Sequence, residues 1–142
     1  ELFSAEKLKS SIVHHADHFA TTLYINEGKG KFRPIIMDSP LQWSPCRAAS
    51  IIDINGDKLP DLLTGGNFYG ANIEMGRYDA DYGTMSVNLG QGKFQVLKLQ
   101  NLALKGQIRD LQIINTVMGK HIVAAFNSDS LRIIRISPPH GQ

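Results

Sequence analysis

Short apolar runs rich in β-branched and aromatic residues recur along the chain, and glycines or polar residues separate them. Residues 19–26 contain Thr-Thr-Leu-Tyr-Ile, and residues 31–36 form a second run after Gly28-Lys29-Gly30. Residues of these types favour strands, and the two glycines can adopt the dihedral angles that a tight turn requires. The pattern predicts an antiparallel hairpin over these two runs.

The rest of the chain continues in the same way. Residues 111–114 and 121–126 are apolar runs on either side of Gly119, where we expect a tight turn, and residues 131–136 form a last strand. Thirteen glycines and six prolines interrupt the chain too often for long helices. We therefore expect an all-β, antiparallel fold of about nine short strands, with a helical turn or two within residues 1–18.

One motif occurs twice. The pattern Asn-x-Gly-x-Gly-Lys-Phe runs from Asn26 to Phe32 and again from Asn88 to Phe94, which gives a period of 94 − 32 = 62 residues. A repeat of this length fits one propeller blade plus its loops, although it is longer than the usual blade of about 40–50 residues. We expect a single β-repeat domain over residues 1–142, with repeat 1 at about 19–80 and repeat 2 at about 81–137.

Between two apolar runs lies a loop rich in side-chain oxygen. Counted from Asp53, positions 1, 3, 5 and 9 are Asp53, Asn55, Asp57 and Asp61. Calcium accepts six to eight oxygen ligands in loose geometry, and carboxylates this close repel one another unless a cation neutralises them. A polar turn without an ion is the alternative, since Asn-Gly-Asp is turn chemistry by itself.

An EF-hand does not match this loop. That motif needs Gly at position 6 and Glu at position 12, whereas here Gly56 is at position 4 and Thr64 is at position 12. The flanking runs also have the composition of strands rather than of amphipathic helices.

The sequence Asp-Ile-Asn-Gly-Asp-Lys-Leu-Pro-Asp-Leu at 53–62 resembles the calcium loop of FG-GAP/VCBS repeats, which occur in integrin-like β-propellers. The resemblance implies that Ca²⁺ is held by four side chains and one main-chain oxygen: those of Asp53, Asn55, Asp57 and Asp61, and the carbonyl of Leu59. Three further segments are similar to the C-terminal end of large bacterial VCBS-repeat proteins of the ASPIC/UnbV-associated kind: residues 65–70, 76–80 and 127–131.

As blades of that family, the strands would be the last two of one blade, a complete four-stranded blade and three strands of another. These are about two propeller-blade-like repeats, too few to close a propeller, and their open edges would favour an edge-strand dimer. In the second copy Ile113, Asn115, Val117 and His121 replace the four ligands, so we expect no ion there.

The function that the resemblance implies is a non-catalytic, calcium-binding module for recognition or adhesion. The parent would be a secreted or cell-surface bacterial protein, hence extracytoplasmic, with a protein or carbohydrate ligand. The alternative is an accessory carbohydrate-binding domain of a larger hydrolase. Because the chain starts at Glu1 rather than Met, we expect it to be a piece of a longer protein.

Charge and composition limit the classes of partner that the chain is expected to bind. The net charge is +2 without a block of like charges, which gives no electrostatic case for nucleic acid or a membrane surface. An apolar run of 18 residues is absent from the sequence, so we expect no membrane span. With Cys46 as the single cysteine, no internal disulfide is expected.

Three histidines near the start of the chain are a further candidate for a metal site. His14, His15 and His18 suggest a metal site, but adjacent residues on a strand point to opposite faces, and zinc-type spacing is lacking. We expect solvated or packed histidines.

The irregular stretch 66–82 mixes aromatic and charged residues, as binding loops often do. We expect either a recognition surface or an ion pair of Arg77 with Asp79 or Asp81. General acid–base catalysis by Glu74, Asp79 and Asp81 is conceivable, but the sequence shows no nucleophile or base to act with them. We therefore expect that the chain is not an enzyme. Trp43 is expected in the core or between blades, with sugar stacking as the alternative.

Overall fold

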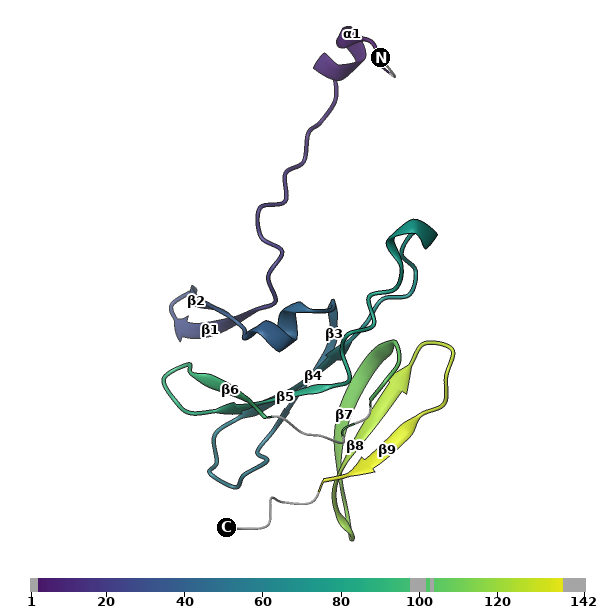
Figure 1. Cartoon of the computed structure of the whole chain (residues 1–142). Coiled ribbons are helices and arrows are strands. Elements are labelled where there is room, and N and C mark those ends of the chain that lie inside the picture. Colours follow the sequence, from purple (N-terminus) through teal and green to yellow (C-terminus); the bar gives the residue numbers. More distant parts are fainter. Residues whose placement is uncertain (1–2, 98–101, 103, 137–142) are drawn as a thin grey trace.

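The computed structural model describes residues 3–97, 102 and 104–136. Nine strands lie within these ranges (Figure 1). They are β1 Thr22–Gly28, β2 Lys31–Ile36, β3 Cys46–Ile52, β4 Asp61–Gly66, β5 Thr84–Asn88, β6 Phe94–Leu97, β7 Ile108–Thr116, β8 Gly119–Phe126 and β9 Arg132–Arg135. The short helices are α1 Ala5–Lys9, η1 Ser39–Gln42 and η2 Ile73–Met75.

The strands form three antiparallel sheets with the orders β1-β2, β3-β4-β5-β6 and β7-β8-β9. The predicted all-β, antiparallel class is therefore confirmed, and so is the expected division into two, four and three strands. Over the described residues the sheets do not close into a barrel or propeller (Figure 1).

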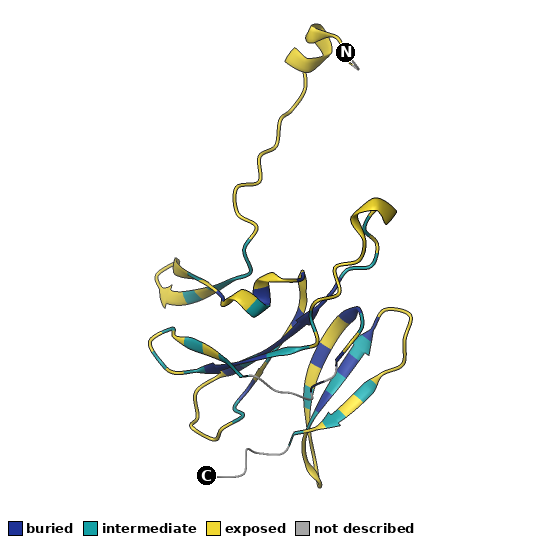
Figure 2. Cartoon of the chain, viewed as in Figure 1, coloured by how far each residue is buried: buried dark blue, intermediate teal, exposed yellow. Residues whose placement is uncertain are grey.

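The helices contribute little to this body. A long exposed segment separates α1 from β1 and holds the helix away from the sheets (Figures 1 and 2). Ser4 caps α1 by accepting a hydrogen bond from the amide of Lys7 at 3.5 Å. In the described part of the chain, no helix combines the length and the apolar character needed to cross a membrane.

The core lies where the four-stranded and three-stranded sheets face each other. Leu63 on β4 and Met85 on β5 meet Ile108 and Leu111 on β7, and all four are almost inaccessible to solvent. Buried segments, dark blue in Figure 2, lie on strands of both sheets. Burial of an apolar side chain of this size contributes roughly 1.5–3 kcal/mol. This apolar contact fixes the two larger sheets against each other.

The two copies of the repeated motif form the same turn. Residues 28, 29 and 30 have φ of 81°, 51° and 73°, and residues 90, 91 and 92 have 81°, 55° and 77°. In each turn the asparagine side chain accepts a hydrogen bond at 2.9 Å from the amide two residues later. The left-handed φ explains the glycines, and the shared geometry makes β1–β2 the counterpart of β5–β6.

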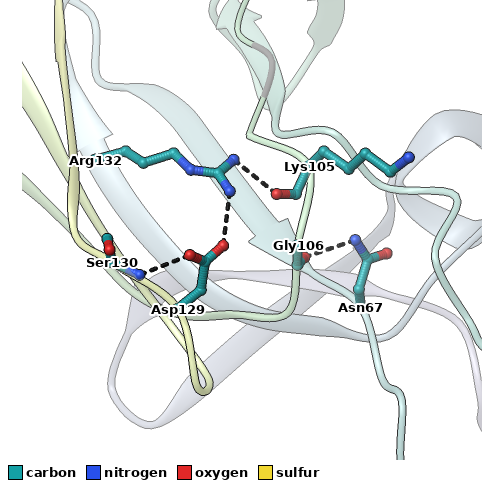
Figure 3. Close-up of polar contacts among 6 residues, drawn as sticks. All are labelled: Asn67, Lys105, Gly106, Asp129, Ser130 and Arg132. Atoms are coloured by element: carbon teal, nitrogen blue, oxygen red, sulfur yellow. Dashed lines mark hydrogen bonds and ion pairs between the residues drawn. The ribbon is translucent and has the colours of Figure 1, made fainter.

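Asn67 lies immediately after β4 and ties three segments together. It is fully buried with φ of 81°, a left-handed value that asparagine tolerates better than most residues. Its Nδ2 donates to the carbonyls of Asp81 and Gly106 at 2.7 and 2.8 Å, and its Oδ1 accepts from the Ser44 hydroxyl at 2.7 Å and the Asp81 amide at 3.0 Å (Figure 3 shows the Gly106 bond). All side-chain hydrogen-bonding capacity of Asn67 is thereby used.

The segment that Asn67 holds is also held from the other side. Arg132 donates to the carbonyl of Lys105 at 2.7 Å and pairs with Asp129 at 2.8 Å (Figure 3). Its guanidinium also lies 4.3 Å from the ring centroid of Phe126. Residues 105 and 106, which lead into β7, are thus fixed between the end of β4 and the start of β9.

Two expectations on aromatic and strand placement are wrong. Trp43 is 60% exposed instead of buried, because its indole nitrogen donates to the Ser39 hydroxyl at 3.1 Å on the surface of η1. The first strand begins at Thr22 rather than residue 19, since the Thr21 amide bonds to the side chain of Gln42 instead of to a strand.

Replacing Asn67 with Ala is expected to lower the free energy of unfolding by about 3 kcal/mol. The change leaves buried carbonyl and hydroxyl groups without partners and places alanine at a left-handed φ. Asn72→Ala, at an exposed site, is the matched control and should change stability by less than about 0.5 kcal/mol. Urea denaturation measures both, and equal stability of the two variants would contradict this role.

Candidate calcium-binding loop

The loop of residues 53–60 connects β3 to β4, and its ends are closed by the pairing of Ile52 with Asp61. Gly56 has φ of 83° and Lys58 has φ of 68°. Two left-handed residues within three positions bend the chain back on itself. Glycine accommodates this conformation without strain, which explains Gly56 at the tip.

Three of the predicted ligands stabilise the loop from within. The Asp53 carboxylate accepts hydrogen bonds from the amides of Gly56 at 2.7 Å and Lys58 at 3.1 Å. Asn55 Oδ1 accepts from the Asp57 amide at 3.0 Å, and Asp57 Oδ1 accepts from the Leu59 amide at 2.7 Å. These side chains therefore keep their oxygens close to the loop backbone.

Asp61, the fourth predicted ligand, is fully buried at the start of β4. Its Oδ2 accepts from the amide of Ile54 at 2.9 Å, and its Oδ1 accepts from the amide of Asn88 at 2.8 Å. Asn88 also donates its side-chain amide to the carbonyl of Pro60 at 3.1 Å. One carboxylate thus joins the start of the loop to the end of β5.

The donor set contains only oxygen, the ligand type that calcium prefers. Each carboxylate oxygen has a second lone pair beyond its present hydrogen bond, so Asp53, Asn55 and Asp57 retain capacity for a cation, and the Leu59 carbonyl lies on the same loop. In the described ranges, however, no three His, Cys, Asp or Glu side chains are gathered into a group that could hold a metal. Asp61 differs from the other three in that it is fully buried, with both carboxylate oxygens accepting from backbone amides.

Neither the three N-terminal histidines nor the second repeat forms a loop like that of residues 53–60. His14, His15 and His18 lie exposed between α1 and β1, and His18 contacts the Thr22 hydroxyl at 2.6 Å. The positions equivalent to the ligands lie on the β7–β8 hairpin, where Thr116 pairs with Gly119 across a two-residue turn.

Residues 67–82 form an arm that projects from the body beside β3 and β4 (Figure 1). Phe68 and Tyr78 exchange two backbone hydrogen bonds at its base, at 2.9 and 3.0 Å. The expected ion pair is wrong: Arg77 pairs with neither Asp79 nor Asp81 and instead lies 4.9 Å from the ring centroid of Tyr69. The cation–π contact explains this orientation without a carboxylate.

Asp81 stands at the base of the arm, with Oδ1 accepting from the Gly83 amide at 2.8 Å. Burial raises the pKa of this carboxyl above its ordinary value, although hydrogen bonds from Gly83 and Gly66 oppose the rise. Burial also raises the pKa of the nearby Cys46 thiol, and the negative charge of Asp81 adds to that rise. Both groups are therefore biased toward their neutral forms.

Two features of the loop's surroundings were missed from sequence. Asn88 was recognised as part of a repeated turn, but not as the partner of Asp61. Lys120 donates to the main-chain carbonyl of Asp53 at 3.1 Å, although 67 residues separate the two. Only the packing of the three-stranded sheet, β7-β8-β9, against the loop brings Lys120 and Asp53 together.

Comparison with protein-family models, with curated proteins and with solved structures found no match for this chain. The similarity to FG-GAP/VCBS repeats therefore stays a prediction from the loop and its neighbouring segments.

Replacing Asp61 with Asn is expected to lower the free energy of unfolding by about 1.5–3 kcal/mol, measured by urea denaturation with a calcium chelator present. The amides of Ile54 and Asn88 bond to different carboxylate oxygens, and asparagine replaces one of these with an NH2 group that cannot accept. A lost hydrogen bond to a charged group costs this much. Asp79→Asn, on the exposed part of the arm, serves as control. Unchanged stability of the Asp61 variant would refute its anchoring role.

The raised pKa of Asp81 predicts the pH dependence of stability. Because the folded state binds the Asp81 proton more tightly than the unfolded state, the free energy of unfolding falls as pH rises from the ordinary carboxyl pKa through the raised one. Asp81→Asn removes this titration, so its stability relative to wild type should increase over that interval. Denaturation at a series of pH values measures the difference, and a constant or decreasing difference would contradict it.

Proposed function

We propose that this chain is a non-catalytic, calcium-binding β-repeat module that acts in recognition or adhesion outside the cytoplasm. The observation that carries the proposal is the arrangement of Asp53, Asn55 and Asp57, whose oxygens line one tightly bent turn of backbone. A bound calcium ion would neutralise the carboxylates and cross-link the loop. Asp61 would anchor the loop beneath it.

The ion's effect would be on stability. A ligand that binds only the folded state stabilises it by about 2.7 kcal/mol at a hundredfold excess over its dissociation constant. Extracellular calcium modules often have dissociation constants of about 10⁻⁴–10⁻³ M. A site of that affinity would be filled where free calcium is in the millimolar range, as the proposed extracytoplasmic location requires.

The projecting arm supports a recognition role. Its tip carries Ile73, which is 97% exposed, and Met75, and its base carries the exposed Tyr78 and Tyr82. Exposed aromatic and apolar residues on a protruding segment are typical of contact surfaces. The outer edges of β6 and β9 carry no further strand among the described residues, which supports pairing with a second copy.

A carbohydrate-binding accessory domain is the second candidate, and the exposure of Trp43 favours it. Its indole ring could stack on a sugar. Tyr69 is the poorer platform, because Arg77 covers one face of its ring.

Calcium is expected to raise the thermal midpoint of the wild-type chain in a saturable way, and Asp57→Asn should reduce or abolish that rise. The variant removes one carboxylate oxygen of the loop without touching the buried Asp61. Differential scanning calorimetry measures the midpoint over a calcium series, with magnesium as a second ion.

Asp79→Asn is the control, since it removes a carboxylate outside the loop and should keep the full calcium response. A wild-type midpoint that does not move with calcium would overturn the proposed function. An equal response in both variants would place the ion elsewhere.

A further inference from the structure

A cavity of about 360 Å³ lies beside the candidate calcium loop. Three segments that are distant in sequence form its walls: residues 53–56 of the loop, residues 118–120 at the β7–β8 turn, and residues 135–136 at the end of β9. The bond from Lys120 to the Asp53 carbonyl holds the first two walls together, and the Ile136 amide donates to the Lys120 carbonyl at 2.9 Å to hold the third.

The cavity carries two cationic side chains: Arg135, and Lys120, which uses one of its three ammonium donors on the Asp53 carbonyl and keeps two for a ligand. Lys120 and Arg135 are exposed, and neither forms an ion pair within the described ranges. The one acidic side chain in the lining, Asp53, directs both oxygens to amides of its own loop. The lining therefore has a net charge of +1, which matches a ligand with one negative charge better than a phosphate dianion.

The remaining lining is apolar or offers hydrogen bonds. Ile54, Met118 and Ile136 supply apolar surface, and Asn55 supplies an amide. Ligand pockets usually begin at about 300 Å³, so this cavity has room for one small ring but not for a large ligand. A pyranose carries apolar C–H faces and hydroxyl edges, which correspond to these two kinds of surface.

We propose that this cavity binds a single uronic acid unit of an acidic glycan. The guanidinium of Arg135 can grip the sugar carboxylate through two parallel hydrogen bonds, and the ammonium of Lys120 adds a second charge. An aspartate or glutamate side chain of a protein partner carries the same charge but would leave most of the cavity unfilled. The inference names a ligand for the recognition role proposed above and rests on that role, although not on the ion.

Isotope-labelled protein titrated with galacturonate and with short oligogalacturonides, and followed by amide NMR spectra, tests the proposal. Saturable shifts are expected for Gly56, Gly119 and Lys120, and glucose, which lacks the carboxylate, should not produce them. Lys120→Gln and Arg135→Gln should each weaken binding about tenfold or more, as expected for loss of a charge-assisted hydrogen bond. Lys31→Gln and Arg109→Gln, at exposed positions on β2 and β7, are the matched controls and should bind as the wild type does.

The same spectra show whether each variant is folded. If Lys120→Gln disturbs the loop, Arg135→Gln still tests the proposal, because it leaves the Lys120–Asp53 contact intact. Absence of saturable shifts with every uronate would overturn the proposal, as would equal binding by all four variants. Tighter binding of N-acetyl-aspartyl amide than of galacturonate would overturn the choice of a glycan. Repeating the uronate titration with calcium and with a chelator shows whether uronate binding depends on the ion. The calorimetric calcium series tests the calcium proposal independently.

Discussion

The loop between β3 and β4 depends on the buried carboxylate of Asp61. A buried charge is tolerated only when hydrogen bonds replace its lost hydration, and here the amides of Ile54 and Asn88 do so. The same two bonds fix the beginning of the loop and the end of β5 relative to β4. The oxygens of Asp53 and Asp57 therefore belong to a loop that these bonds tie to β4 and β5.

The packing of the four-stranded and three-stranded sheets determines which residues surround the loop. Their apolar contact, centred on Leu63 and Leu111, brings the β7–β8 turn alongside residues 53–56. Lys120 then reaches the Asp53 carbonyl and Arg135 completes the cavity. The candidate ion loop and the proposed glycan cavity are thus neighbours because of sheet packing. Asn67 and Arg132 strengthen the same packing from the opposite end of the sheets.

Local sequence patterns were sufficient to predict the class of fold. Glycine-marked turns such as 28–30 and 90–92 end strands for reasons that lie within a few residues, so the number of strands could be derived. Their grouping into two, four and three strands came from the family resemblance. The oxygen-rich loop was equally visible, because its spacing is local. The bonds of Asp61 to Asn88 and of Lys120 to Asp53 were not, since they span 27 and 67 residues and depend on how sheets pack. Trp43 and Arg77 were misplaced for a similar reason, as surface partners decide their orientation.

Amide NMR spectra recorded during a calcium titration would show whether residues 53–61 hold the proposed ion. With calcium raised to about 10 mM, above the range of about 10⁻⁴–10⁻³ M typical of extracellular modules, we expect saturable shifts concentrated at Gly56, Lys58 and Leu59. Amides of this loop that do not respond, or responses spread evenly over the surface, would contradict the proposed calcium site.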